Sequence, residues 1–281
     1  MTDVASGTNG NISLTTTSGD ITGLATVNAG SGNVTLNSAG AIVDDGSAGT
    51  VITGGVLTAD AAGAITIDST VASANISTSA AGNVDLDETD GITLTDLDTN
   101  DGSITVEAGG LITATDVVAA GGSGDSVTLT TTTGGAVATL VTGADAVSIT
   151  ANAGDITIGA VTATAGILGV TATAGSINDA ADDNTADFTA GGLITLTAQD
   201  EIGVLGSGTD TDLEFATGSS VNVSTTGTGA IDLDGLGTLT LTDLDTANGA
   251  ITATSGGALT VTDVASGTNG NISLTTTSGD I

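Results

Sequence analysis

A short apolar–polar–apolar triplet recurs along the whole chain, and its spacing limits the possible fold more than any other feature. Thirteen such triplets begin at Ile12, Val34, Ile65, Val84, Ile104, Val127, Val147, Leu168, Ile194, Leu213, Ile231, Ile251 and Ile272. From the first to the last there are 272 − 12 = 260 residues, so the mean interval is about 21.7 residues. Period-two alternation inside a period of about 20 residues, with Gly, Asn and Asp between the triplets, is typical of a β-solenoid.

The composition supports the same fold class. Gly contributes 44 of the 281 residues, and the polar residues between the aliphatic ones are mostly Thr, Ser, Asn and Asp, which disfavour helix. We therefore expect an all-β chain, a single continuous parallel β-helix (β-solenoid) over residues 1–281. It should have about 12–13 coils of roughly 20–22 residues. The longer intervals after Val34 and after Leu168 are expected to hold loops.

A much longer repeat is superimposed on the short one. Residues 2–21 recur without a change as residues 262–281, at an offset of 260 residues. We interpret the chain as one 260-residue tandem repeat, 2–261, plus the start of the next copy. A weaker duplication aligns residues 82–117 with residues 229–264. The domain prediction is thus one solenoid cut from a longer array.

The charge inventory excludes several classes of function. The chain has 33 acidic residues and no Lys, Arg or His, which gives a net charge of −33. Nothing can neutralise a phosphate backbone, so we expect no nucleic-acid partner, and no apolar run is long enough to predict membrane insertion. Since Cys and Tyr are absent too, almost all of the usual catalytic acids, bases and nucleophiles are missing, and only carboxylates and hydroxyls remain. We predict that the protein is not an enzyme; a glycosidase using Asp232 and Asp234 is the enzymatic alternative.

Acidic residues are expected to stack in neighbouring coils, which points to cation binding. Residues 2–261 hold 33 − 2 = 31 acids, since Asp263 and Asp280 belong to the second copy. About twelve coils at about 4.8 Å give a rod of about 58 Å, hence one charge per about 1.9 Å, close to the value for duplex DNA. Divalent cations, Ca²⁺ in particular, prefer such oxygen ligands. The predicted metal ligands are Asp68, Asp85, Asp87, Glu107, Asp212, Glu214, Asp232 and Asp234. The competing interpretation is a solvated acidic face.

Pairs of threonines within the triplets raise another possibility. Thr128 and Thr130 occupy outward positions of one coil, and Thr195 and Thr197 of another. A flat threonine array can order water, so ice binding remains an alternative, although the acidic residues of other triplets are expected to interrupt the same face.

Three segments carry a family resemblance: GNISLTTTSGDI at 10–21, GNVTLNSAGAI at 32–42 and GSITVEAGGLI at 102–112. They resemble the repeats of filamentous-haemagglutinin-like adhesins and other giant bacterial surface proteins. The resemblance implies a right-handed parallel β-helix, exported to the bacterial cell surface by two-partner secretion or as an autotransporter passenger.

Two functions follow from these observations. The first is a structural, non-enzymatic extracellular fibre or adhesin-stalk module, screened by cations and able to contact further copies of itself end to end or laterally. The alternative is a calcium-dependent adhesin module that binds a glycan or ice.

Overall fold

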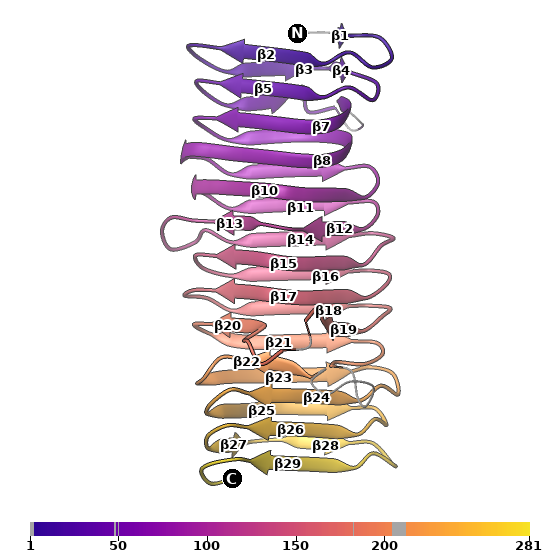
Figure 1. Ribbon diagram of the computed structural model, residues 1–281, viewed down its shortest axis with the longest axis vertical. Helices are drawn as coiled ribbons and strands as arrows, with labels where there is room; N and C mark the ends of the chain where they lie inside the picture. The colour runs from indigo at the N-terminus through magenta and orange to yellow at the C-terminus, as the bar shows by residue number, and fades with distance from the viewer. Residues whose placement is uncertain (1–2, 48, 50, 182, 204–211) are drawn as a thin grey trace.

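The protein is a straight β-solenoid with its termini at opposite ends of a rod (Figure 1). The computed structural model describes residues 3–47, 49, 51–181, 183–203 and 212–281. Over these residues it contains no helix, and 59% of the residues are in strands. The chain winds through about 13 turns of about 21 residues each. Every strand pairing is parallel, and all 29 strands belong to one sheet. The predicted all-β parallel solenoid is confirmed.

The strands follow one another along the rod axis. The first nine are β1 (Asp3–Ala5), β2 (Ile12–Thr16), β3 (Ile21–Leu24), β4 (Thr26–Asn28), β5 (Val34–Ser38), β6 (Ile42–Asp44), β7 (Ile52–Ala61), β8 (Ile65–Ala81) and β9 (Val84–Glu88). The middle ten are β10 (Ile92–Asp101), β11 (Ile104–Ala108), β12 (Ile112–Ala114), β13 (Val117–Ala119), β14 (Val127–Thr131), β15 (Ala136–Gly143), β16 (Val147–Ala151), β17 (Ile156–Ala163), β18 (Leu168–Ala172) and β19 (Ile177–Asp179). The last ten are β20 (Phe188–Ala190), β21 (Leu193–Ala198), β22 (Leu213–Phe215), β23 (Ser219–Thr225), β24 (Ile231–Gly235), β25 (Leu239–Thr246), β26 (Ile251–Ser255), β27 (Leu259–Val261), β28 (Val264–Ser266) and β29 (Ile272–Thr276).

Each coil contributes to two faces of the rod. Face A is built by the successive pairings of β6, the start of β8, β9, β11, β14, β16, β18, β21, β23 and β25. Face B is built by β2, β5, the second half of β7, the end of β8, β10, β15, β17, β22, β24, β26 and β29, with the short strands β12, β13, β19 and β20 between them. One face of a coil carries a segment with regular inward–outward alternation. The other face carries two segments joined by residues that interrupt this alternation, either within one strand, as in β17, or as separate strands, as in β12 and β13.

The face that carries two segments changes along the rod. In the middle coils, β11 is unbroken on face A while β12 and β13 form two segments on face B. In the last coils, β27 and β28 are the two segments on face A while β29 is unbroken on face B. The internal duplication therefore lies half a coil out of phase: residues 93–99 run along face B, whereas residues 240–246 run along face A.

This change of face corrects the predicted stacking of the triplets. Val34 pairs with Leu57 on face B, whereas Ile65 pairs with Ile42 on face A. The interval after Val34 contains two strands, β6 and β7, and the described residues 45–47, 49 and 51 between them are not strand, in line with the expected loop. The interval after Leu168 is as expected: Leu168 pairs with Ile194, and the described residues 180–181 and 183–187 between β19 and β20 are not strand.

The core consists of columns of aliphatic side chains that stack on similar residues from coil to coil. Ile42, Ile65, Val84 and Ile104 form one such column, and each is at most 1% exposed. The column works without large side chains because consecutive rungs lie only about 4.8 Å apart. The two phenylalanines are the exception: Phe188 and Phe215 are in register and stack with ring centroids 5.3 Å apart.

Glycines are required where consecutive coils touch at a corner. A methyl group at Gly249 would lie 1.8 Å from the carbonyl oxygen of Gly229, and one at Gly270 would lie 1.9 Å from that of Gly249. A Cβ atom cannot approach a backbone oxygen so closely, so this column excludes every other residue. The corner glycines thus fix the close spacing that the strand ladders need.

Candidate functional site

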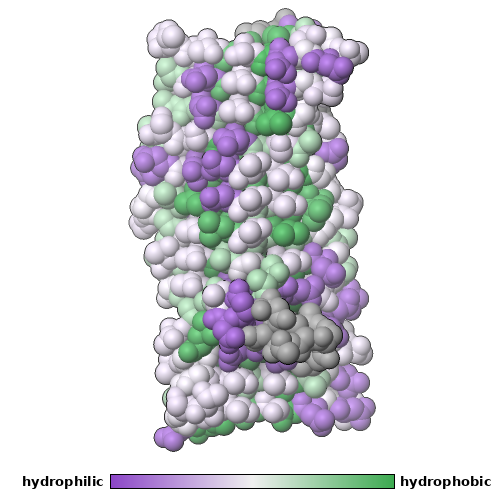
Figure 2. All heavy atoms as spheres, in the orientation of Figure 1, coloured by the Kyte–Doolittle hydropathy of each residue, from purple (hydrophilic) through white to green (hydrophobic). Residues whose placement is uncertain are grey.

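Three of the predicted metal ligands form a column on the outside of face A. Asp68, Asp87 and Glu107 are register partners in three consecutive coils, as the triplet alignment predicted. Asp85 lies in the neighbouring outward column, between Thr66 and Thr105. The three stacked acids line an open groove of about 330 Å³. Hydrophilic side chains gather in separate patches along the rod, with surface of intermediate hydropathy between them (Figure 2).

The charges of this column disfavour one another. Partial burial raises the pKa of Asp87, and the nearby carboxylates of Asp85, Asp68 and Glu107 raise it further. Burial also raises the pKa of Asp68, and Asp44 adds to the effect. Stacked carboxylates repel because no basic side chain exists in the chain to pair with them. The column attracts cations, but its carboxylate oxygens do not converge as those of the buried cluster described below do.

Glu88, the residue after Asp87, points into the core instead of outward. Glu88 takes an inward position between Ser69 and Ala108 and is 4% exposed. Its carboxylate accepts a hydrogen bond from the Ser69 hydroxyl at 2.6 Å and another from the backbone N–H of Val71 at 3.1 Å. Burial raises its pKa despite these bonds. Glu88 is thus a structural acid that bridges two coils, and the triplet pattern did not indicate it.

The four predicted ligands near the C-terminal end lie on face B. Glu214 and Asp234 are register partners, and Asp232 precedes Asp234 by two residues on β24. Burial raises the pKa of Asp232 to about 6, with further contributions from Asp212 and Asp234. Asp232 and Asp234 alternate with inward residues, so they project from the same side of one strand. Two such carboxylates do not flank a glycosidic bond, which argues against the glycosidase alternative.

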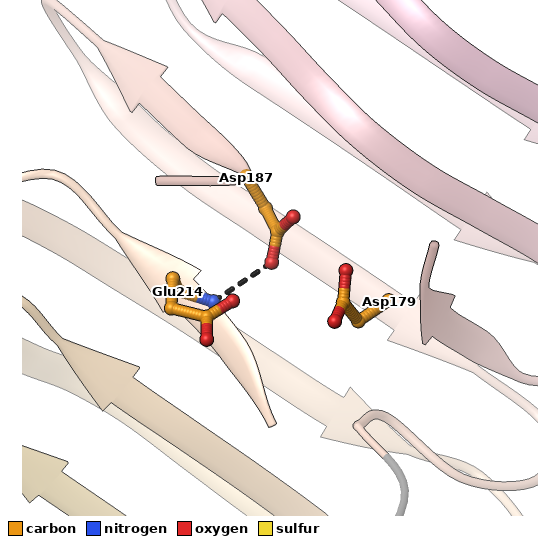
Figure 3. Close-up of side chains that lie close together, drawn as sticks. All are labelled: Asp179, Asp187 and Glu214. Atoms are coloured by element: carbon orange, nitrogen blue, oxygen red, sulfur yellow. Dashed lines mark hydrogen bonds between the residues drawn. The ribbon is translucent and has the colours of Figure 1, made fainter. Parts of the chain in front are cut away.

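Glu214 is buried, whereas the sequence predicted that its side chain faces solvent. It alternates with Leu213 and Phe215, yet its side chain is 1% exposed. Instead of facing solvent it meets Asp179, the last residue of β19, and Asp187, which immediately precedes β20 (Figure 3). One carboxylate oxygen from each of the three residues lies within 4.8 Å of the other two. We call these three residues the buried triad.

The buried triad is largely shielded from solvent and poorly satisfied by hydrogen bonds. Asp187 is 4% exposed, and its Oδ2 accepts a hydrogen bond of 2.9 Å from the backbone N–H of Glu214. Within the described part of the chain, neither carboxylate oxygen of Glu214 has a hydrogen-bond partner. Phe188 directly follows Asp187 and Phe215 directly follows Glu214, and their stacked rings are buried in the core.

This environment raises the pKa values of Glu214 and Asp187. Burial raises the pKa of Glu214 to about 10, and the Asp187 carboxylate adds to the shift. Burial likewise raises the pKa of Asp187 to about 7, and the hydrogen bond from the Glu214 backbone N–H partly opposes this shift. The pair titrates as a unit, and Glu214 keeps its proton at neutral pH when nothing else neutralises it.

The buried triad can hold a metal ion. Three carboxylates that converge within a few ångströms match the oxygen ligands that hard divalent cations prefer. Among the described residues, no other group of three acids converges in this way. The sequence pointed to Glu214 but not to its partners. The available signal was the 26-residue interval after Leu168, together with Asp179 at a position where the preceding coil has the core residue Ile158.

Threonines form a second ordered feature on face A. Thr130, Thr150, Thr171 and Thr197 are register partners in four consecutive coils. Acidic residues were expected to interrupt this face at both ends, but Asp232 and Asp234 lie on face B because the unbroken strands change face before β24. Acids nevertheless bound the threonine column at both ends: Glu107 is the register partner of Thr130, and Asp245 is that of Ser224, the residue that follows Thr197 in the column.

Comparison with known proteins gives no relative: no protein family, no curated protein and no solved structure matches the chain. Across the described residues there is no helix of the length and apolarity needed to cross a membrane. The interpretation of function therefore depends on the geometry of the solenoid itself.

The raised pKa values predict that the metal-free protein loses stability as pH rises. A carboxyl whose pKa is higher in the folded state binds more protons there than in the unfolded state, so the free energy of unfolding falls above the ordinary carboxyl range. For Glu214 the loss is about 1.4 kcal/mol per pH unit. Glu214→Gln, which mimics the neutral acid, should therefore be increasingly more stable than the parent between about pH 5 and about pH 7.

Thermal or urea unfolding monitored by circular dichroism in the presence of a chelator measures this effect. Glu107→Gln is the matched control, because it removes one acid from an exposed rung without changing a buried carboxyl. A Glu214→Gln protein with the same pH dependence as Glu107→Gln would show that Glu214 is not buried as described.

Proposed function

We propose that this chain is a rigid, non-enzymatic structural module, one repeat of a tandem β-solenoid array in an extracellular fibre or adhesin stalk of a bacterial surface. The observation that carries the proposal is the register of the repeated segment. Ile272, the copy of Ile12, pairs with Ile251 and continues face B without a break. A following copy can therefore continue the same ladder, because its first coil is identical to one that is already stacked there.

The exposure of the two copies supports end-to-end continuation. Ile12 is 6% exposed and has Val34 of the following coil as its register partner, whereas Ile272 is 46% exposed. The same contrast holds for Ile21, at 5%, and its copy Ile281, at 67%. The last coil thus presents an apolar column and unpaired strand edges, both of which a further coil would cover.

The charge of the rod fits a module that works among cations. Outward acids stack in neighbouring coils without a single basic residue in the sequence to compensate them. Lateral or end-to-end contact between two such rods brings like charges together, and dissolved cations reduce this repulsion. We therefore expect self-association to increase with salt, and more steeply with divalent cations.

Electron microscopy of a protein with two consecutive 260-residue repeats tests the proposed function. Each repeat should add about 58 Å to a straight rod, because about twelve coils rise by about 4.8 Å each. In the single-repeat protein, salt should promote threads made of rods joined end to end. Globular particles, or a second repeat that does not lengthen the rod, would contradict the proposal.

A matched pair of variants shows whether the threads use the apolar column. Ile272→Asp places a charge in the column, whereas Thr275→Asp places the same charge on the outward side of the same strand. The first variant should form separate short rods under conditions where the second still forms threads. Equal thread formation by both variants would mean that the rods associate through another surface.

The threonine column supports a second candidate function, ice binding through face A. Its four rungs are spaced regularly at about 4.8 Å, and Thr128 and Thr195 extend the polar surface in the adjacent column. Such a flat array presents hydroxyl and methyl groups on a fixed lattice.

Thermal hysteresis of freezing measures this activity directly. Thr150→Tyr, in the middle of the column, should abolish any hysteresis, whereas Thr142→Tyr on face B should leave it unchanged. An absence of hysteresis in the parent protein would remove this candidate and leave the structural proposal untouched.

A further inference from the structure

The buried triad poses an electrostatic problem that the chain cannot solve with its own side chains. Three carboxylates converge, two of them are at most 4% exposed, and the sequence contains no Lys, Arg or His. Burying uncompensated charge is costly, and a protein normally relieves it with an ion pair. Here the compensating positive charge has to come from outside the chain.

Glu214 gives the second, independent indication of a ligand. Both of its carboxylate oxygens are buried, and neither has a hydrogen-bond partner in the described part of the chain. Its side chain faces the carboxylates of Asp179 and Asp187, as Figure 3 shows. An orphaned buried carboxylate is rare in a native protein, because leaving an acceptor unsatisfied costs about 1–3 kcal/mol. A ligand that accepts electron pairs from oxygen would satisfy all three residues at once.

We infer that the buried triad is a specific binding site for one hard divalent cation, with Ca²⁺ as the best-fitting ion. Oxygens on opposite sides of a Ca²⁺ ion lie up to about 4.8 Å apart, since each Ca–O distance is about 2.4 Å. The three carboxylate oxygens lie within 4.8 Å of one another and so fit one coordination sphere. Ca²⁺ accepts six to eight oxygens in flexible geometry, and second carboxylate oxygens and water can complete the set.

The location gives the ion a structural role. In the coils before it, two residues join the segments of face B, such as Gly159 and Ala160 between Ile158 and Val161. In this coil a longer connection, of which residues 180–181 and 183–187 are described, takes their place; Asp179 lies just before it and Asp187 at its end. Glu214 contributes from the next coil. One ion would therefore fix both ends of the long connection and hold it to its neighbour.

The site is distinct from the acidic column of face A, and it does not depend on the proposed fibre function. Glu107 and its neighbours line an open groove and attract cations through the general charge of the rod. Such attraction is screened at high ionic strength, whereas buried ligands are screened much less. This difference separates specific binding from condensation of counter-ions.

Isothermal titration calorimetry with Ca²⁺ in about 1 M NaCl, where the screening length is about 3 Å, tests the inference. The full chain should bind one ion per molecule in a saturable manner. Glu214→Gln and Asp187→Asn should each lower the affinity at least tenfold, as expected for the loss of a ligand. Glu107→Gln, the same substitution in the exposed groove, should bind as the parent does.

Thermal unfolding provides the second readout. Added Ca²⁺ should raise the Tm of the parent and of Glu107→Gln at constant ionic strength, but not that of Glu214→Gln. The Tm of Glu214→Gln without Ca²⁺ is measured in the same series, so that a loss of binding is distinguished from a loss of the fold. Absence of saturable binding in the parent, or equal binding by Glu214→Gln, would overturn the assignment.

Discussion

The parallel hydrogen-bonded ladder is the interaction on which the rest of this structure depends. Each coil adds its strands to those of the coil before it, and all 29 strands of the described residues belong to one sheet. The ladder sets a rung spacing of about 4.8 Å, and this spacing determines which side chains are allowed. Aliphatic residues stack inside, small polar residues stack outside, and glycine is required where corners touch, as at Gly249.

The same ladder creates the electrostatic character of the protein. Because register partners lie directly above one another, acids in neighbouring coils become neighbours in space, as Asp68 and Asp87 do. With a net charge of −33 and no basic residue, the repulsion can be relieved only by protons or by external cations. On the surface this relief is diffuse and depends on salt. At the buried triad the three carboxylates converge, so the same requirement becomes local and selective.

The sequence allowed the fold to be predicted almost completely, because a solenoid repeats its local pattern. Each triplet lies in a strand, and the column of Asp68, Asp87 and Glu107 follows directly from the triplet alignment. Period-two alternation does not show on which face of a coil a triplet lies. Ile65 and Ile231 look equivalent in sequence, yet they lie on faces A and B, because the faces exchange their roles twice along the rod. The buried triad was missed for a related reason: Asp179, Asp187 and Glu214 meet across an irregular connection, where no repeat predicts the contacts.

Fibre diffraction from an aligned sample of the protein tests the central claim most directly, that the coils stack in parallel along the rod axis. The account predicts a strong reflection at about 4.8 Å along that axis, because every rung of every ladder is perpendicular to it. A reflection of that spacing at right angles to the long axis, or the absence of any such reflection, would contradict the account.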